Sequence, residues 1–182
     1  MCGAWGLAGA VVRVVGESGG GGAGLGRMGL AVAEGVSGLA GRAWPLFSPV
    51  IGGLGAFVAG SNTVSNMMFS SFQFGVGERI GVDPSWIVAL QAVGGAAGNM
   101  ICVHNVVAAS AVVGLLGKEG MIIRTTIFPF MYYALLAGAV GYSIVWTSEK
   151  GIANIGTLIA GAIVIAVVVT IYRGSRPAGS SD

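Results

Sequence analysis

The feature that most constrains this chain is a charge-free run of about 35 residues, from Ala43 to Gly77, with polar residues at its middle. One membrane crossing needs ~20 apolar residues and two crossings need ~40 plus a turn, so the run suits neither. Two half-length helices that meet at the polar stretch Gly60–Asn66 fit the length instead. We therefore predict a re-entrant helical hairpin over residues 44–77, which enters and leaves the membrane on one side.

A second uncharged run, from Pro84 to Gly117, is also interrupted, by the glycine-rich stretch Gly94–Asn99. Unwound backbone at membrane depth survives only where it lines a cavity, and paired interrupted segments point to a transporter's binding site. We expect a broken transmembrane helix over residues 84–117, with halves at 86–93 and 100–116 and its break at Gly94–Asn99.

The composition indicates an all-α integral membrane protein. Hydrophobic residues make up 54% of the chain, charged residues 9%, and the mean hydropathy is +0.85, whereas soluble domains carry about 25% charged residues. Two more apolar stretches, 125–146 and 152–172, predict further spans, so that the transporter domain covers residues 43–172. Loop charges favour a cytoplasmic C-terminus.

The remaining segments are not spans. Residues 1–27 are glycine-rich and predict a poorly ordered N-terminus, residues 28–42 predict an amphipathic interfacial helix, and residues 173–182 predict a disordered tail. The net charge of +2 is small and scattered, which gives no support for nucleic-acid binding. The two cysteines, Cys2 and Cys102, suggest free thiols rather than a disulfide or metal site, and we expect no metal and no cofactor.

Polar side chains gather at the hairpin tip and beside the helix break. The start of the returning half-helix offers unpaired N–H groups and partial positive charge, which suit a small carboxylate, while the break offers oxygens for a cation or a proton carrier. We predict that the substrate-binding residues are Ser61, Asn62, Thr63, Ser65, Asn66, Gly98 and Asn99, and that the proton-coupling candidates are His104 and Asn105.

Each of these predictions has an alternative. Serine, threonine and asparagine in membrane helices also hydrogen-bond to neighbouring helices, and His104 could be such a donor without titrating. Gln73 and Gln91 are read as packing partners rather than ligands. No nucleophile–base pair falls within the spans, which argues against an enzyme.

Two long runs resemble the C-terminal part of the bacterial L-lactate permease family: GSNTVSNMMFSSFQF at residues 60–74 and IVALQAVGGAAGNMICVHNVVAAS at residues 87–110. The resemblance covers about Trp44 to Tyr142 well and the last span loosely. It implies a multi-pass protein of the bacterial cytoplasmic (inner) membrane that takes up lactate or glycolate with protons, or with sodium.

The same resemblance implies the second half of an inverted-repeat transporter. Ser61, Asn62 and Thr63 map onto the tip of the second repeat, and Gly94–Asn99 onto the break in the helix behind it. Since such transporters build their site between two repeats, we expect a truncated or split permease that needs a missing N-terminal half or another copy. The alternative is a non-transporting membrane remnant or interaction module.

Overall fold

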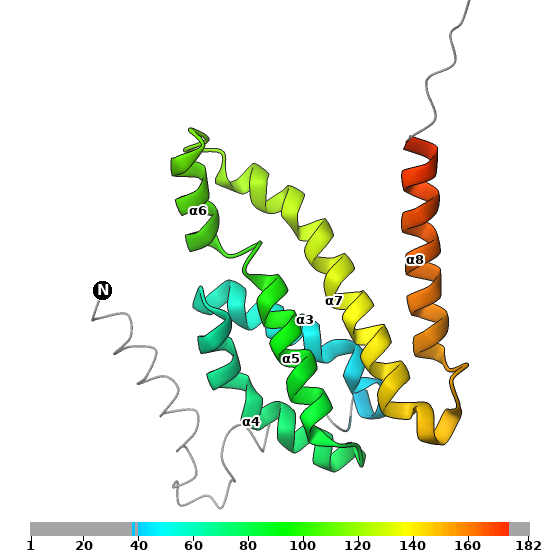
Figure 1. Ribbon diagram of the computed structural model, residues 1–182. Coiled ribbons are helices and arrows are strands. Elements are labelled where there is room, and N and C mark those ends of the chain that lie inside the picture. The colour runs from blue at the N-terminus through cyan, green and yellow to red at the C-terminus, as the bar shows by residue number, and fades with distance from the viewer. Residues whose placement is uncertain (1–37, 39, 175–182) are drawn as a thin grey trace, which may run out of the picture.

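The computed structural model describes Gly38 and residues 40–174, and every regular element within them is a helix (Figure 1). The predicted all-α class is therefore confirmed for that part of the chain. Most of the predicted interfacial helix, the predicted N-terminal segment and residues 175–182 of the predicted tail lie outside it. The elements are η1 (Gly41–Ala43), α3 (Trp44–Ala59), α4 (Asn62–Ile80), α5 (Pro84–Gly98), α6 (Val103–Val112), α7 (Glu119–Lys150) and α8 (Ile155–Gly174).

Helices α3 and α4 form an antiparallel pair that turns at Gly60 and Ser61. Gly60 ends α3 with a φ of 73°, a conformation that favours glycine, and the Ser61 Oγ accepts a hydrogen bond from the Val64 N–H at 3.4 Å. Arg42, before α3, forms an ion pair with Glu149, and Glu149 lines one cleft with residues 81–83, after α4. The chain thus returns from the tip to the end of the molecule where the pair began.

The position of the break in the second uncharged run was predicted wrongly. Residues 94–98 are helical and belong to α5, and the break falls at residues 99–102, before a short α6. The glycines there serve close packing instead: a Cβ atom on Gly94 would overlap the carbonyl oxygen of Pro49, and one on Gly98 would overlap that of Gly53. Small residues let α5 lie directly against the backbone of α3, as expected of glycines within spans.

Three segments of the described residues are long and apolar enough to cross a membrane. They are Pro84–Val112, which includes the break, Glu119–Lys150 and Ile155–Arg173. Helix α7 has 32 residues and extends beyond the predicted 125–146, while α8 begins at Ile155 rather than residue 152. These segments support a multi-pass membrane protein.

The core lies between the hairpin, α5 and α7. One cluster gathers Trp44, Phe72, Val76 and Ile87 near the start of α3, and another gathers Ile101, Phe130 and Ala134 beside the break. Helix α8 stands apart from this core (Figure 1) and is fastened to α7 at its first turn, where Asn154 caps the helix through the Thr157 N–H and donates to the Ser143 carbonyl.

Candidate functional site

The hairpin tip and the helix break lie side by side, and together we call residues 60–66 and 99–105 the tip–break region. A Cβ atom on Gly60 would lie 2.9 Å from His104 Nδ1, so the imidazole rests directly on the tip. The Asn62 Oδ1 occupies the space that a Cβ atom on Gly95 would fill. The structure thus brings the two predicted polar groups together, although the break itself begins later than expected.

Two helix N-termini converge in this region. Helix α4 begins at Asn62 after the Ser61 cap, and α6 begins at Val103 after Cys102, whose side chain makes no capping hydrogen bond. Figure 1 places the junction of α3 and α4 next to the start of α6. Because each N-terminus carries unpaired N–H groups and partial positive charge, the region is electrostatically suited to an anion.

Two amide pairs organise the polar side chains. Across the break, Asn105 Nδ2 donates to the Asn99 carbonyl at 3.2 Å and to Asn99 Oδ1 at 3.3 Å. On the tip, Asn66 Nδ2 donates to Asn62 Oδ1 at 3.3 Å, whereas the buried Asn66 Oδ1 has no hydrogen-bond partner among the described residues. A buried acceptor without a partner is costly, and no described residue offsets that cost for this oxygen.

The predicted proton-coupling residues are exposed. His104 Nδ1 lies 3.8 Å from the Cys102 Sγ, within the same broken segment, and both His104 and Asn105 are open to solvent in this chain. Thr63 is exposed as well, while Ser61 and Asn62 are half-buried. These residues surround an accessible surface rather than a sealed cavity.

Ser65 and Gly98 face away from that surface. Ser65 is fully buried, and its Oγ donates to the Gly52 carbonyl at 2.9 Å and accepts from Gln91 Nε2 at 3.1 Å. Gly98 is buried against Gly53 of α3. Both residues therefore hold helices together, and they do not join the other predicted ligand residues.

Sequence reasoning missed the buried polar chain that continues from Ser65. Trp44 Nε1 donates to Gln73 Oε1 at 2.8 Å, and Gln73 Nε2 donates to Gln91 Oε1 at 3.0 Å. Trp44 itself lies in the core, with only 3% of it exposed. The interpretation of the two glutamines as packing partners agrees with these contacts.

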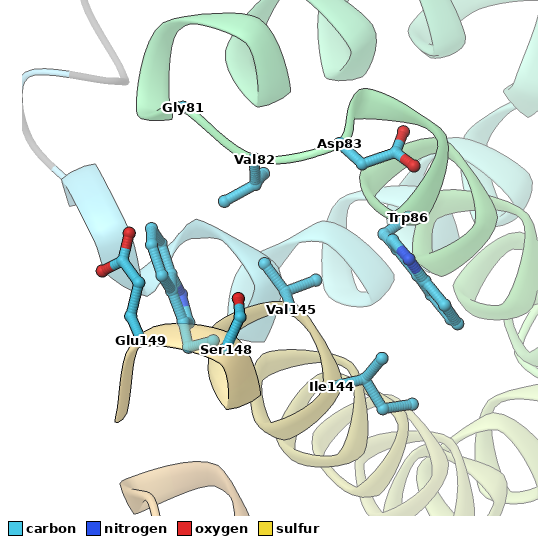
Figure 2. Close-up of a pocket in the computed structure, with 9 residues that line it drawn as sticks. Gly81, Val82, Asp83, Trp86, Ile144, Val145, Ser148 and Glu149 are labelled. Atoms are coloured by element: carbon cyan, nitrogen blue, oxygen red, sulfur yellow. The ribbon is translucent and has the colours of Figure 1, made fainter. Parts of the chain in front are cut away.

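Sequence reasoning also missed a polar cleft of about 310 Å³ (Figure 2). It lies at the end of the molecule where α4 and α7 end and α5 begins, between residues 81–86 and 144–149. Its walls come from segments about 60 residues apart in the chain, so no local motif marks it. Among the residues described, no His, Cys, Asp and Glu side chains gather into a group that could hold a metal ion.

Comparison with known proteins matches residues 5–148 to the family described as L-lactate permease. A putative L-lactate permease of Haemophilus influenzae is 44% identical over 99 residues, which are 54% of this chain and 19% of that protein. An L-lactate permease of Escherichia coli is 36% identical over 110 residues, with shares of 58% and 20%. The glycolate permease GlcA of Escherichia coli is 35% identical over 97 residues, with shares of 53% and 17%.

The chain thus spans about a fifth of the length of the curated relatives that it matches, as the 19% and 20% shares indicate. No solved structure matches it.

Proposed function

Since this chain belongs to the L-lactate permease family, we propose that it forms part of a secondary transporter that takes up small monocarboxylates, such as lactate or glycolate, by proton symport. The relatives are described as lactate and glycolate permeases. The observation that carries the proposal is the contact of His104 with Gly60, because it brings the N-termini of α4 and α6 to one polar surface.

The proposed anion site is the tip–break region. The substrate carboxylate would accept hydrogen bonds from the N–H groups at the start of α6 and from the hydroxyls of Ser61 and Thr63. Asn62 and Asn99 hold these groups through the two amide pairs. Ser65 and Gly98 are left out, since both are buried in helix contacts.

His104 is the proposed proton carrier. It is the only histidine of the chain, it lies against the tip, and its ring is accessible. Protonation would place a positive charge beside the bound carboxylate, so that anion and proton bind in support of one another. Sodium coupling is the alternative that the transport assay below distinguishes.

In the proposed topology the hairpin dips into the bacterial inner membrane and returns, while the segments 84–112, 119–150 and 155–173 cross it. Both ends of the hairpin lie beside Glu149, which supports an entry and exit on one side. Inverted-repeat transporters complete their site with a second tip. We propose that another polypeptide half, or a second copy of this chain, supplies it.

Uptake of labelled lactate into proteoliposomes tests the proposal. A pH gradient, acidic outside, should drive accumulation in a full-length relative, and a sodium gradient alone should not. Asn62→Ala and Asn99→Ala at the matching positions should lower uptake at least tenfold, the loss expected when about 1.4 kcal/mol of binding is removed. Ser71→Ala, an exposed hydroxyl on α4 away from the tip, is the matched control. Unchanged uptake in both asparagine variants would refute the site.

The same assay on the 182-residue chain alone tests whether this segment transports without further polypeptide. Uptake by the purified chain would show that copies of it complete the site. Uptake only after addition of the remaining part of a relative would show that the chain does not transport alone and acts as one segment of a split transporter.

A further inference from the structure

An apolar groove lies next to the polar cleft, between α5 and α7. The groove has a volume of about 300 Å³ and lies between Trp86, Leu90 and Val93 of α5 and residues 133–144 of α7. Trp86 and Ile144 line both cavities, so the polar cleft and the apolar groove adjoin at these two side chains. A polar compartment joined to an apolar one has the chemistry of a site for an amphiphile.

The position of the two cavities in the fold fits one leaflet of a bilayer. The α5 segment begins at Pro84 and the α7 segment ends at Lys150, so the cleft lies where both candidate spans end. The groove extends over 12 residues of α7, or ~16 Å from the first to the last, which is about half of the ~30 Å hydrocarbon thickness. Trp86 is 43% exposed at the boundary between the compartments, a usual place for an interfacial tryptophan.

The charges of the cleft select the headgroup. Its lining carries two carboxylates, Asp83 and Glu149, and no lysine or arginine. Glu149 is already paired with Arg42, whereas among the described residues Asp83 accepts only the Ser85 N–H, at 2.9 Å, through Oδ1. Figure 2 shows Asp83 on the same side of the cleft as Trp86, with Glu149 on the opposite side. One uncompensated negative charge at the mouth of the groove is complementary to a cation.

We propose that the cleft and groove bind a glycerophospholipid with a primary-amine headgroup. Its ammonium group donates to the free Asp83 Oδ2, its phosphate accepts from the Ser148 hydroxyl and the Trp86 indole N–H, and one acyl chain fills the groove between Trp86 and Tyr133. Such a lipid would pack α5 against α7 at a surface that their own side chains leave open. This site is separate from the tip–break region, and its test does not depend on transport.

The test is native mass spectrometry of the full chain released from nanodiscs that hold equal amounts of phosphatidylethanolamine and phosphatidylglycerol. We expect phosphatidylethanolamine adducts to exceed phosphatidylglycerol adducts about threefold to fivefold, the range for one partly exposed charge pair. Asp83→Asn should abolish the preference while keeping the helix cap, because asparagine caps as well as aspartate. Glu119→Gln, a change of an acid at the opposite end of α7, should leave the preference intact.

A second variant tests the groove. Ala137→Trp places a large ring between α5 and α7 and should lower retention of both lipids, with helicity by circular dichroism as the check on folding. Equal retention of the two lipids by the unmodified chain, or a preference that survives Asp83→Asn, would overturn the proposal. The proposal would also be overturned if Ala137→Trp disrupted a dimer and left lipid retention unchanged. The groove would then be a contact surface for a second copy of the chain.

Discussion

Gln73 of α4 donates from Nε2 to Oε1 of Gln91 of α5 at 3.0 Å, and both side chains are fully buried. This bond is the middle link of a chain that begins at Trp44 and ends at Ser65, whose hydroxyl donates to the Gly52 carbonyl. The chain joins α3, α4 and α5 away from water. It holds the hairpin at a fixed position on α5, and thereby sets where the tip meets the break.

Removal of one glutamine should destabilise the protein more than its own bond suggests. Gln91→Leu leaves Gln73 Nε2 without an acceptor and Ser65 without a donor, and both are buried. We expect a loss of ~1–2 kcal/mol in the free energy of unfolding in detergent.

The double variant Gln73→Leu/Gln91→Leu is the control, because it removes both partners of the central bond. Its cost should fall below the sum of the single variants by ~0.5–1 kcal/mol. Strictly additive costs would mean that the two side chains do not interact.

Close packing of α3 on α5 makes a second prediction. Gly94→Ala forces a methyl group against the Pro49 carbonyl, which is backbone and cannot turn aside. The expected cost is ~2–3 kcal/mol, measured by thermal unfolding. Gly161→Ala is the matched control, since nothing lies within 4 Å of the added carbon, and helix propensity should stabilise it slightly, by at most ~1 kcal/mol. Equal losses for the two variants would contradict the packing argument.

Local signals located the hairpin turn but not the helix break. Gly60 followed by Ser61 marks a helix end and a helix start, and both occur where the polar residues predict them. A glycine-rich stretch is an ambiguous signal, however, because glycine occurs both where a helix unwinds and where two helices pack closely. Which of the two applies at Gly94 depends on α3, whose Pro49 lies against it, and periodicity within α5 carries no information about that neighbour.

The candidate site, like the fold, could be predicted from the sequence only in part. Asn62, Asn99 and His104 stand out as polar residues in apolar surroundings, and the structure brings them to one region. Ser65 is chemically indistinguishable from Ser61 in the sequence, yet Ser61 caps α4 at the turn, whereas Ser65 lies inside the helix, one turn deeper, where it meets Gln91. Orientation around a helix axis depends on the neighbouring helices, which a single sequence does not specify.

The re-entrant topology predicts that both ends of the hairpin are accessible from the same side of the membrane. Cysteines placed at Arg42 and Glu78, in a chain whose own Cys2 and Cys102 are replaced by alanine, should react with a membrane-impermeant maleimide from the same side of oriented vesicles. Both residues are exposed at the end of the molecule where α3 begins and α4 ends. A cysteine at Lys118, between α6 and α7, should react from the other side. Labelling of positions 42 and 78 from opposite sides would rule out the hairpin.

Replacement of His104 by glutamine distinguishes two roles for the imidazole: carrying the proton, or making a hydrogen bond alone. In a full-length relative, His104→Gln at the matching position keeps a hydrogen-bonding side chain against Gly60 but removes the imidazole, the proposed proton carrier. If the imidazole carries the proton, the variant should lose pH-driven accumulation of lactate at least tenfold and keep lactate exchange across the membrane, which needs no net proton movement.

The dependence of lactate uptake on external pH gives a second test of the role of His104. Proton-coupled uptake should rise as the external pH falls, since protonation of the carrier favours anion binding, and His104→Gln should flatten that rise. Asn105→Gln changes the neighbouring amide without touching a titrating group, so it should lower uptake and leave the slope of the profile unchanged. Full pH-driven accumulation in His104→Gln would assign the imidazole a hydrogen-bonding role alone, and the proton would then have to be carried by a group outside this chain's charge-free stretches.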